Sequence, residues 1–192
     1  SNAAKVFRDA QGVQINHIYG PHPSGNIGVQ IHHIEPINKG DVVWYLSPQD
    51  VVMIARFFRD GKYDASKIIA LTGSQVKKPR YYRVLQGMSV DSILNNNLLE
   101  GNCRVISGNV LTGSKIKTTG YLGFYDFQIC VIPEGDYSEF FGWLLPGFHK
   151  YSLSRTFFSW LSSKKEYELD SNTHGEERAF VMTGQYEAYM PM

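Results

Sequence analysis

The pattern of apolar and polar residues is clearest between residues 41 and 71, where it predicts a strand, a helix and a second strand. Residues 41–46 are rich in β-branched and aromatic side chains, which favour a buried strand. Residues 66–71 predict the second strand, and Thr72 and Gly73 are expected to close it. The order and spacing predict a βαβ unit with parallel strands and a right-handed crossover.

The helix between those strands carries signals at both ends. Ser47 is expected to be its N-cap and Pro48 its first residue, with an acidic residue three positions after the cap. Gly61 is expected to end the helix. Apolar residues recur at the spacing of one helical face: Val51, Ile54, Ala55 and Phe58.

A loop rich in glycine and proline precedes these elements, at residues 20–28. It lacks the lysine of a phosphate-binding P-loop, and its glycine spacing does not match the dinucleotide-binding fingerprint. Residues 29–34 alternate weakly and predict a strand. A rigid structural turn is therefore the favoured interpretation over nucleotide binding. Its residues remain ligand or interface candidates: Gly20, Pro21, His22, Pro23, Gly25 and Gly28.

A basic, proline-marked segment at residues 77–80 suggests a domain boundary. After it, a short helix is expected, capped by Ser89 and ended by the asparagines at 95–97. Its buried face would be Val90, Ile93 and Leu94. Short strands are predicted at 81–85, 104–107, 110–112 and 128–132. One helix among four strands predicts a small α+β domain in which a sheet grasps a helix.

The last part of the chain, residues 136–192, is expected to be a β-rich extension with a strand at 179–182. Its aromatic stretch contains Phe141 and Trp143, which are either core residues or candidates for a protein contact. At the other end, residues 1–3 are typical of an expression-tag remnant and are excluded from the fold prediction.

Composition and charge exclude several classes of function. The 192 residues hold 19 Lys and Arg against 18 Asp and Glu, so a net charge of +1 favours neither nucleic acid nor anionic lipid. No apolar run is long enough to span a bilayer. Cys103 and Cys130 form no CxxC pair, so free thiols are expected and a cysteine-based metal or iron–sulfur site is excluded.

The histidines are the one plausible set of metal ligands: His17, His22, His32 and His33. Adjacent histidines on a strand point to opposite faces, so His32 and His33 cannot both serve one site. Surface histidines are the simpler interpretation, and no metal site is predicted, although His32 stays a ligand candidate. No Gly-x-Ser-x-Gly motif and no clearly electropositive cysteine is present, so no catalytic residue is predicted.

Several long strings, taken together, resemble the NqrA family, the NqrA subunits of the Na+-translocating NADH:quinone oxidoreductases. In chain order they are GPHPSGNIG with VQIHHIEPI (20–37), VVWYLSPQDVVMIARFF (42–58), RVISGNVLTGSK (104–115), YLGFYDFQICVI (121–132), FFGWLLPG (140–147), SLSRTF (152–157) and GEERAFVMTGQYEAYMP (175–191). The resemblance implies a middle fragment of a protein more than twice as long. The apolar end of this chain also suggests a piece cut from a longer polypeptide.

The resemblance implies a fold of the α/β plus α+β class in three parts. Residues 4–79 would be the C-terminal part of a Rossmann-like domain, similar to the flavoprotein subunit of complex I. Residues 80–135 would be an SLBB domain, a β-grasp fold suspected of binding small ligands. Residues 136–192 would be the β-rich extension, which could pack back on the first domain.

The resemblance also implies a peripheral subunit on the cytoplasmic face of the bacterial inner membrane. Its partners would be the other subunits of a six-subunit complex, with quinone as a further candidate and no nucleic acid. NADH, flavins, an iron–sulfur cluster and quinone would be handled by those other subunits. We therefore expect a cofactor-free, catalytically inactive scaffold near the quinone-reducing end. The alternative is a stand-alone α/β protein that binds a small ligand or depends on a histidine-bound metal.

Overall fold

The computed structural model describes residues 9–21, 23–136, 139–142, 144–151, 155–162 and 166–172. Two compact units divide the chain, Ser1–Ser47 with Ala179–Met192 and Pro48–Arg178. His22, Trp143 and the strand expected at 179–182 lie outside the described residues.

In the first unit, the prediction of a strand at residues 29–34 is wrong. Helix α2 (Ile27–Ile34) stands there, and the backbone N–H of Glu35 closes it on the Ile31 carbonyl. Short apolar runs fit a strand and a helix equally well. Here Ile27, Ile31 and Ile34 share the spacing of a helical face, and the loop before them ends in turns that lead into the helix.

Residues 41–46 do not form the strand that their composition favours. The segment has no assigned helix or strand, and its side chains are exposed, with Val42 at 77% and Trp44 at 88%. A strand needs a neighbouring strand to satisfy its backbone, and the described residues of the first unit contain none. The expected βαβ unit is therefore absent. The Rossmann-like fold expected for residues 4–79 is not seen in the described part of that segment.

The second unit begins with helix α3 (Pro48–Asp60), which confirms the helix predicted from its end signals. The amide of Gly61 bonds to the Phe57 carbonyl, and Gly61 has a φ of +67°, the left-handed conformation that ends helices. No residue of α3 is buried. The apolar face is thus formed as predicted, but it lies exposed.

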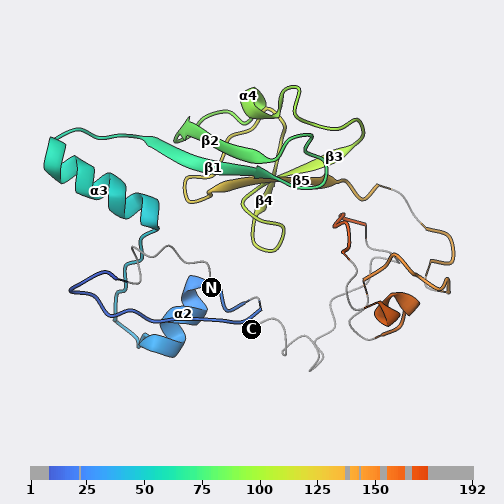
Figure 1. The fold of residues 1–192 in the computed structure, drawn as a ribbon, viewed down its shortest axis with the longest axis horizontal. Coiled ribbons are helices and arrows are strands. Elements are labelled where there is room, and N and C mark those ends of the chain that lie inside the picture. Colours follow the sequence, from blue (N-terminus) through green and yellow to red (C-terminus); the bar gives the residue numbers. More distant parts are fainter. Residues whose placement is uncertain are drawn as a thin grey trace. The chain divides into compact units, whose positions relative to one another are not determined.

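The centre of the second unit is a five-stranded sheet with strand order β2-β1-β5-β3-β4 (Figure 1). β1 pairs in parallel with β5, and the other neighbours pair antiparallel. The sheet extends across the boundary expected at residue 79, because β1 belongs to it. The strands are β1 (Ser66–Thr72), β2 (Arg80–Leu85), β3 (Cys103–Ser107), β4 (Ser114–Ile116) and β5 (Gln128–Pro133).

The short helix α4 (Asp91–Leu94) lies over one face of this sheet, as predicted. Val90, Ile93 and Leu94 are at most 4% exposed and join a core with residues of β1, β3 and β5. Ser89 precedes the N-cap position, which Val90 holds. The asparagines end the helix, with Asn96 at a φ of +64°. The α+β arrangement of one helix against a sheet is confirmed.

The prediction of a strand at residues 110–112 is wrong, because the side chain of Asn109 holds this segment in a turn. The Asn109 Oδ1 atom accepts hydrogen bonds from the amides of Leu111 and Thr112, each at 2.8 Å. Such a bond pattern competes with strand pairing. The strand begins only at Ser114, as β4.

After β5, the described residues between 139 and 172 contain one short 3-10 helix, η1 (Phe158–Leu161), and no strand. The β-rich character expected for residues 136–192 is therefore not found in the part that the structure describes.

Candidate functional site

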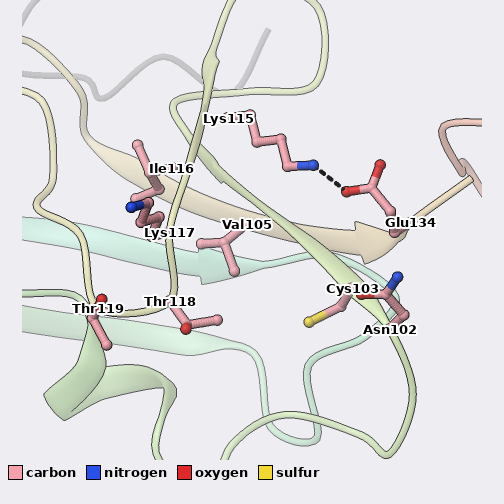
Figure 2. Close-up of a pocket in the computed structure, with 9 residues that line it drawn as sticks. All are labelled: Asn102, Cys103, Val105, Lys115, Ile116, Lys117, Thr118, Thr119 and Glu134. Atoms are coloured by element: carbon pink, nitrogen blue, oxygen red, sulfur yellow. Dashed lines mark hydrogen bonds and ion pairs between the residues drawn. The ribbon is translucent and has the colours of Figure 1, made fainter.

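A pocket of about 580 Å³ opens beside β3 and β4 (Figure 2). Its apolar surface comes from Val105 and Ile116, which also pack in or against the core. The rest of its wall is formed by polar and charged side chains and one thiol: Asn102, Cys103, Lys115, Lys117, Thr118, Thr119 and Glu134. A pocket of this volume with mixed walls is large enough for a small molecule.

Glu134 supplies the negative charge in the wall of the pocket. Its carboxylate accepts hydrogen bonds from the Arg104 guanidinium, from Lys115 Nζ at 2.7 Å and from Ser171 Oγ at 3.0 Å. These contacts, chiefly the one with Arg104, lower the pKa of Glu134 to about 2. The carboxylate therefore stays ionised at neutral pH, and Figure 2 shows Lys115 extended toward it.

The thiol of Cys103 lies within the same pocket and points toward Thr118 (Figure 2). Burial raises the pKa of Cys103, and the negative charge of Glu134 raises it further. A thiol in such surroundings stays protonated at neutral pH and is a poor nucleophile. The pocket is suited to holding a molecule rather than to attacking one.

A tight turn forms the remaining polar edge of the pocket. The amide of Gly120 bonds to the Lys117 carbonyl at 2.8 Å, which closes the turn around Thr118 and Thr119. Both threonines and Lys117 are exposed. Hydroxyl groups and an ammonium group at one rim favour a polar or anionic ligand group.

A second polar cluster lies inside the unit, around Lys67 of β1. This side chain is only 5% exposed, and its ammonium group donates to the carbonyls of Gly123, Phe124 and Asp126 at 3.4, 2.9 and 2.7 Å. It also lies 5.0 Å from the centre of the Phe127 ring. Burial lowers the pKa of Lys67, while Asp126 and Asp50 act in the opposite direction.

The glycine and proline loop singled out in the sequence consists of successive turns. Ser24 N–H bonds to the Pro21 carbonyl, Asn26 N–H bonds to the Pro23 carbonyl, and Ser24 Oγ bonds to the Gly20 carbonyl. Gly20 has a φ of +143°. The loop leads into α2, so Gly28 lies inside a helix rather than before a strand, and Gly25 is exposed just before it. None of the described residues of the loop is among those that line the pocket.

Two of the candidate histidines lie on a helix rather than on the expected strand. His32 and His33 are exposed neighbours on α2, with ring centres 5.4 Å apart, and not residues on opposite faces of a strand. Among the described residues, no group of three His, Cys, Asp or Glu side chains is arranged to hold a metal ion.

Of the two aromatic contact candidates, the structure describes Phe141, which is 50% exposed and lies edge-to-face with Phe140 at 4.4 Å. Phe140 is 86% exposed. The pocket residues and Lys67 were not predicted as site residues from the sequence. One signal was available, since a lysine within an apolar strand is unusual unless its charge finds partners.

Within the described ranges, no helix combines the length and the hydropathy needed to span a bilayer.

Comparison with known protein families gives two matches. Residues 1–63 match a family model described as "NqrA second alpha/beta domain". Residues 68–118 match a second model, of the SLBB type, described as "NQRA C-terminal domain". The second match contains most of β1, all of β2, β3 and β4, and most of the pocket lining.

Curated relatives match nearly the whole chain. They include the NqrA subunits of the Na(+)-translocating NADH-quinone reductases from Pasteurella multocida, 39% identical over all of this chain, and from Rhodopirellula baltica, 42% identical over 96% of it. The corresponding protein from Klebsiella pneumoniae is 40% identical over 94% of the chain. These alignments cover 43%, 41% and 40% of the relatives, so the chain spans about two-fifths of their length.

Proposed function

The chain belongs to the NqrA family, and we propose that it acts as part of the NqrA subunit of a Na+-translocating NADH:quinone reductase. Support comes from alignments with NqrA relatives that are about 40% identical to the chain and cover at least 94% of it. Reduction of quinone and movement of sodium are assigned to the assembled complex, not to these residues alone.

Within that complex we assign the chain a scaffolding role. The observation that carries this proposal is the amount of large apolar surface left exposed, with Trp44 at 88%, Phe58 at 81% and Phe140 at 86%. Extended apolar surfaces mark contacts with other polypeptides. In the proposal, other parts of the complex cover these side chains.

The proposal includes the absence of any flavin or iron–sulfur cluster held by this chain. A cluster held by thiolates requires about four cysteines, and the sequence has two. NADH, flavins, the cluster and quinone are then handled by other members of a six-subunit complex. Visible absorption spectra and NADH oxidation assays of the purified chain test this part. Bound flavin with turnover would contradict it.

The proposed position of the chain within the complex and on the membrane is based on its family membership. We place the chain on the cytoplasmic face of the inner membrane, near the quinone-reducing end. Labelling of the complete complex with a photoreactive quinone, followed by mapping of the labelled peptides, tests the second point. Cross-links confined to subunits that do not touch this chain would count against it.

The scaffolding role is tested by matched substitutions in the complete subunit. Phe58→Ser removes an exposed ring from α3, and Lys62→Ser changes an exposed residue just after it. We expect the first to weaken assembly of the complex by about tenfold and the second to leave it unchanged. Both isolated variants should keep the melting temperature of the wild type. A large loss of stability for Phe58→Ser alone would show that the ring packs within its own chain.

The alternative of small-ligand binding has one observation in its favour, the pocket beside β3 and β4 in the SLBB-matched segment. Thermal-shift measurements with small carboxylates and phosphates test it, using Lys117→Ala as the variant. Stabilisation that this substitution abolishes would support ligand binding.

A further inference from the structure

The pocket beside β3 and β4 has an apolar floor that is formed by packing within the chain. Val105 is 2% exposed and belongs to the core, and Ile116 packs against that core. Both side chains line the pocket. Close-packed side chains keep fixed positions, so this floor exists before any molecule binds. Its chemistry suits the apolar part of a ligand.

Positive charge exceeds negative charge around the pocket. Among the described residues that line it, Glu134 is the one acid. Arg104 and Lys115 both form ion pairs with its carboxylate, so two cations already face one anion. Lys117 adds a further cation to the lining. A negatively charged group that enters the pocket is therefore attracted, whereas a cation is repelled.

The rim of the pocket, formed by Lys117, Thr118 and Thr119, offers hydrogen-bond donors. In the part of the chain that the structure describes, no residue pairs with the Lys117 ammonium or with the hydroxyls of the two threonines. The side chain of Asn102, in contrast, donates to the Asp136 carboxylate at 2.7 Å. That carboxylate offsets part of the positive charge near the pocket, but cations remain in excess.

The Cys103 thiol adds no negative charge to this arrangement. It points toward Thr118 inside the pocket (Figure 2). Burial and the charge of Glu134 raise the pKa of the thiol, so it stays neutral near pH 7. An anionic ligand therefore meets no repulsion from the sulfur, and a molecule in the pocket covers the thiol.

We propose that this pocket binds a small molecule that carries a carboxylate or phosphate group on an apolar body. Lys117, Thr118 and Thr119 bind the anionic group, and Val105 and Ile116 contact the apolar body. The inference rests on the small-ligand alternative described above and specifies the chemistry of its ligand. It does not depend on the scaffolding role, because the tests below read the pocket and not assembly of the complex.

Labelling of Cys103 reports directly on occupancy of the pocket. The complete subunit is treated with iodoacetamide at alkaline pH, with and without phenylbutyrate as the probe, and the Cys103 peptide is followed by mass spectrometry. We expect a saturating concentration of the probe to slow labelling by at least about tenfold, since pockets enclose most of a bound ligand's surface. Cys130 is buried outside the pocket lining and should be unaffected. Equal labelling of Cys103 with and without the probe would overturn the proposal.

The charge of the ligand is tested with compounds that share one skeleton. Phenylbutyrate is compared with the neutral phenylbutyramide and the cationic phenylbutylamine, and the concentration that halves the labelling rate is measured. We expect this concentration to be at least about tenfold higher for the amide and the amine. A phosphate monoester with the same apolar body distinguishes the two anionic groups, and tighter binding of either one supports the proposal. Equal protection by the neutral amide would refute it.

Two matched variants test the role of the rim. Lys117→Ala and Lys78→Ala each remove one exposed lysine, and of these two residues Lys117 lines the pocket. We expect Lys117→Ala to weaken binding of phenylbutyrate by about tenfold and Lys78→Ala to leave it unchanged. Binding that Lys117→Ala does not change, or that both variants weaken equally, would contradict the assignment.

Glu134→Gln gives a readout that a purely structural effect would not produce. Loss of the negative charge in the wall should tighten the binding of phenylbutyrate by a few-fold and weaken that of phenylbutylamine. Half-protection concentrations are compared rather than labelling rates, because the substitution also changes the reactivity of Cys103. Weaker binding of the anion together with tighter binding of the amine would show that the pocket selects cations and would overturn the proposal.

Discussion

The side-chain amide of Gln49 pairs with both backbone polar groups of Ile68. Gln49 Nε2 donates to the Ile68 carbonyl at 2.8 Å, and the Ile68 N–H donates to Gln49 Oε1 at 2.8 Å. On that edge of β1, pairing with β5 begins only at Ala70. The amide of one helical residue thus takes the place of a neighbouring strand and joins α3 to the sheet.

Gln49→Ala should remove both bonds and lower the free energy of unfolding by about 1 kcal/mol. The Ile68 amide should then exchange its hydrogen faster, which mass spectrometry or NMR can measure. Gln49→Glu is a useful comparison, because it keeps the acceptor for the Ile68 N–H but places a carboxylate oxygen opposite the Ile68 carbonyl in place of the donor. Equal exchange rates in the wild type and Gln49→Ala would contradict the pairing.

Glu134 should make stability depend on acid pH. Its pKa is about 2 in the folded chain and lies near 4.3 for a free glutamate, so its contribution is present above about pH 4.5 and is lost as the pH falls toward 2. Glu134→Gln should lower the free energy of unfolding by about 1 kcal/mol near neutral pH, because the ion pairs are partly exposed to solvent. Denaturant titrations across this pH range measure the difference.

The difference between the wild type and Glu134→Gln should disappear at the acid end of that range. Lys115→Met offers a second check, since it removes one of the two cations and should reproduce part of the effect. A difference that does not change with pH would show that the carboxylate charge is not what stabilises the contact.

Two glycines with positive φ should respond very differently to alanine. Gly73 has a φ of +111°, and a Cβ there would lie 2.0 Å from the carbonyl oxygen of Val131. Gly87 has a φ of +74° and nothing within 4 Å of that position. Gly87→Ala should cost about 1 kcal/mol for its backbone conformation, while Gly73→Ala should cost more than about 3 kcal/mol. Thermal unfolding of the two variants measures the loss of stability in each. Equal losses would refute the close approach of Gly73 to β5.

Cys103 should react slowly with alkylating reagents at neutral pH. Burial and the charge of Glu134 raise its thiol pKa, so little thiolate is present. Glu134→Gln should speed the reaction by removing the nearby negative charge. Iodoacetamide rates measured against pH test both statements. A Cys103 that reacts as fast in the folded chain as in the denatured chain would contradict them.

Elements with local signals were predictable from the sequence. The helix after Ser47 has a proline at its start and a glycine at its end, and the structure places it at Pro48–Asp60. The buried face of the short helix α4 was also predictable, because Val90, Ile93 and Leu94 recur at helical spacing. In both cases the decisive interactions join residues within a few positions of one another.

Two short segments could not be assigned from local pattern. Residues 29–34 are few enough to fit either period, and the turns before them lead into a helix. Residues 41–46 have the composition of a buried strand, yet they have no neighbouring strand in the described part of their unit. Strand formation depends on a partner that the segment itself does not contain.

Composition, end signals and family motifs sufficed to predict the α+β character, the main helix and the NqrA relationship. The pocket around Glu134 and the buried polar cluster around Lys67 were decided by the tertiary structure. Lys67 meets carbonyls that lie 56 to 59 residues away, and Arg104 meets a carboxylate 30 residues away. Such contacts depend on which strands become neighbours in the sheet, and hydrophobic period along the chain carries no information about that order.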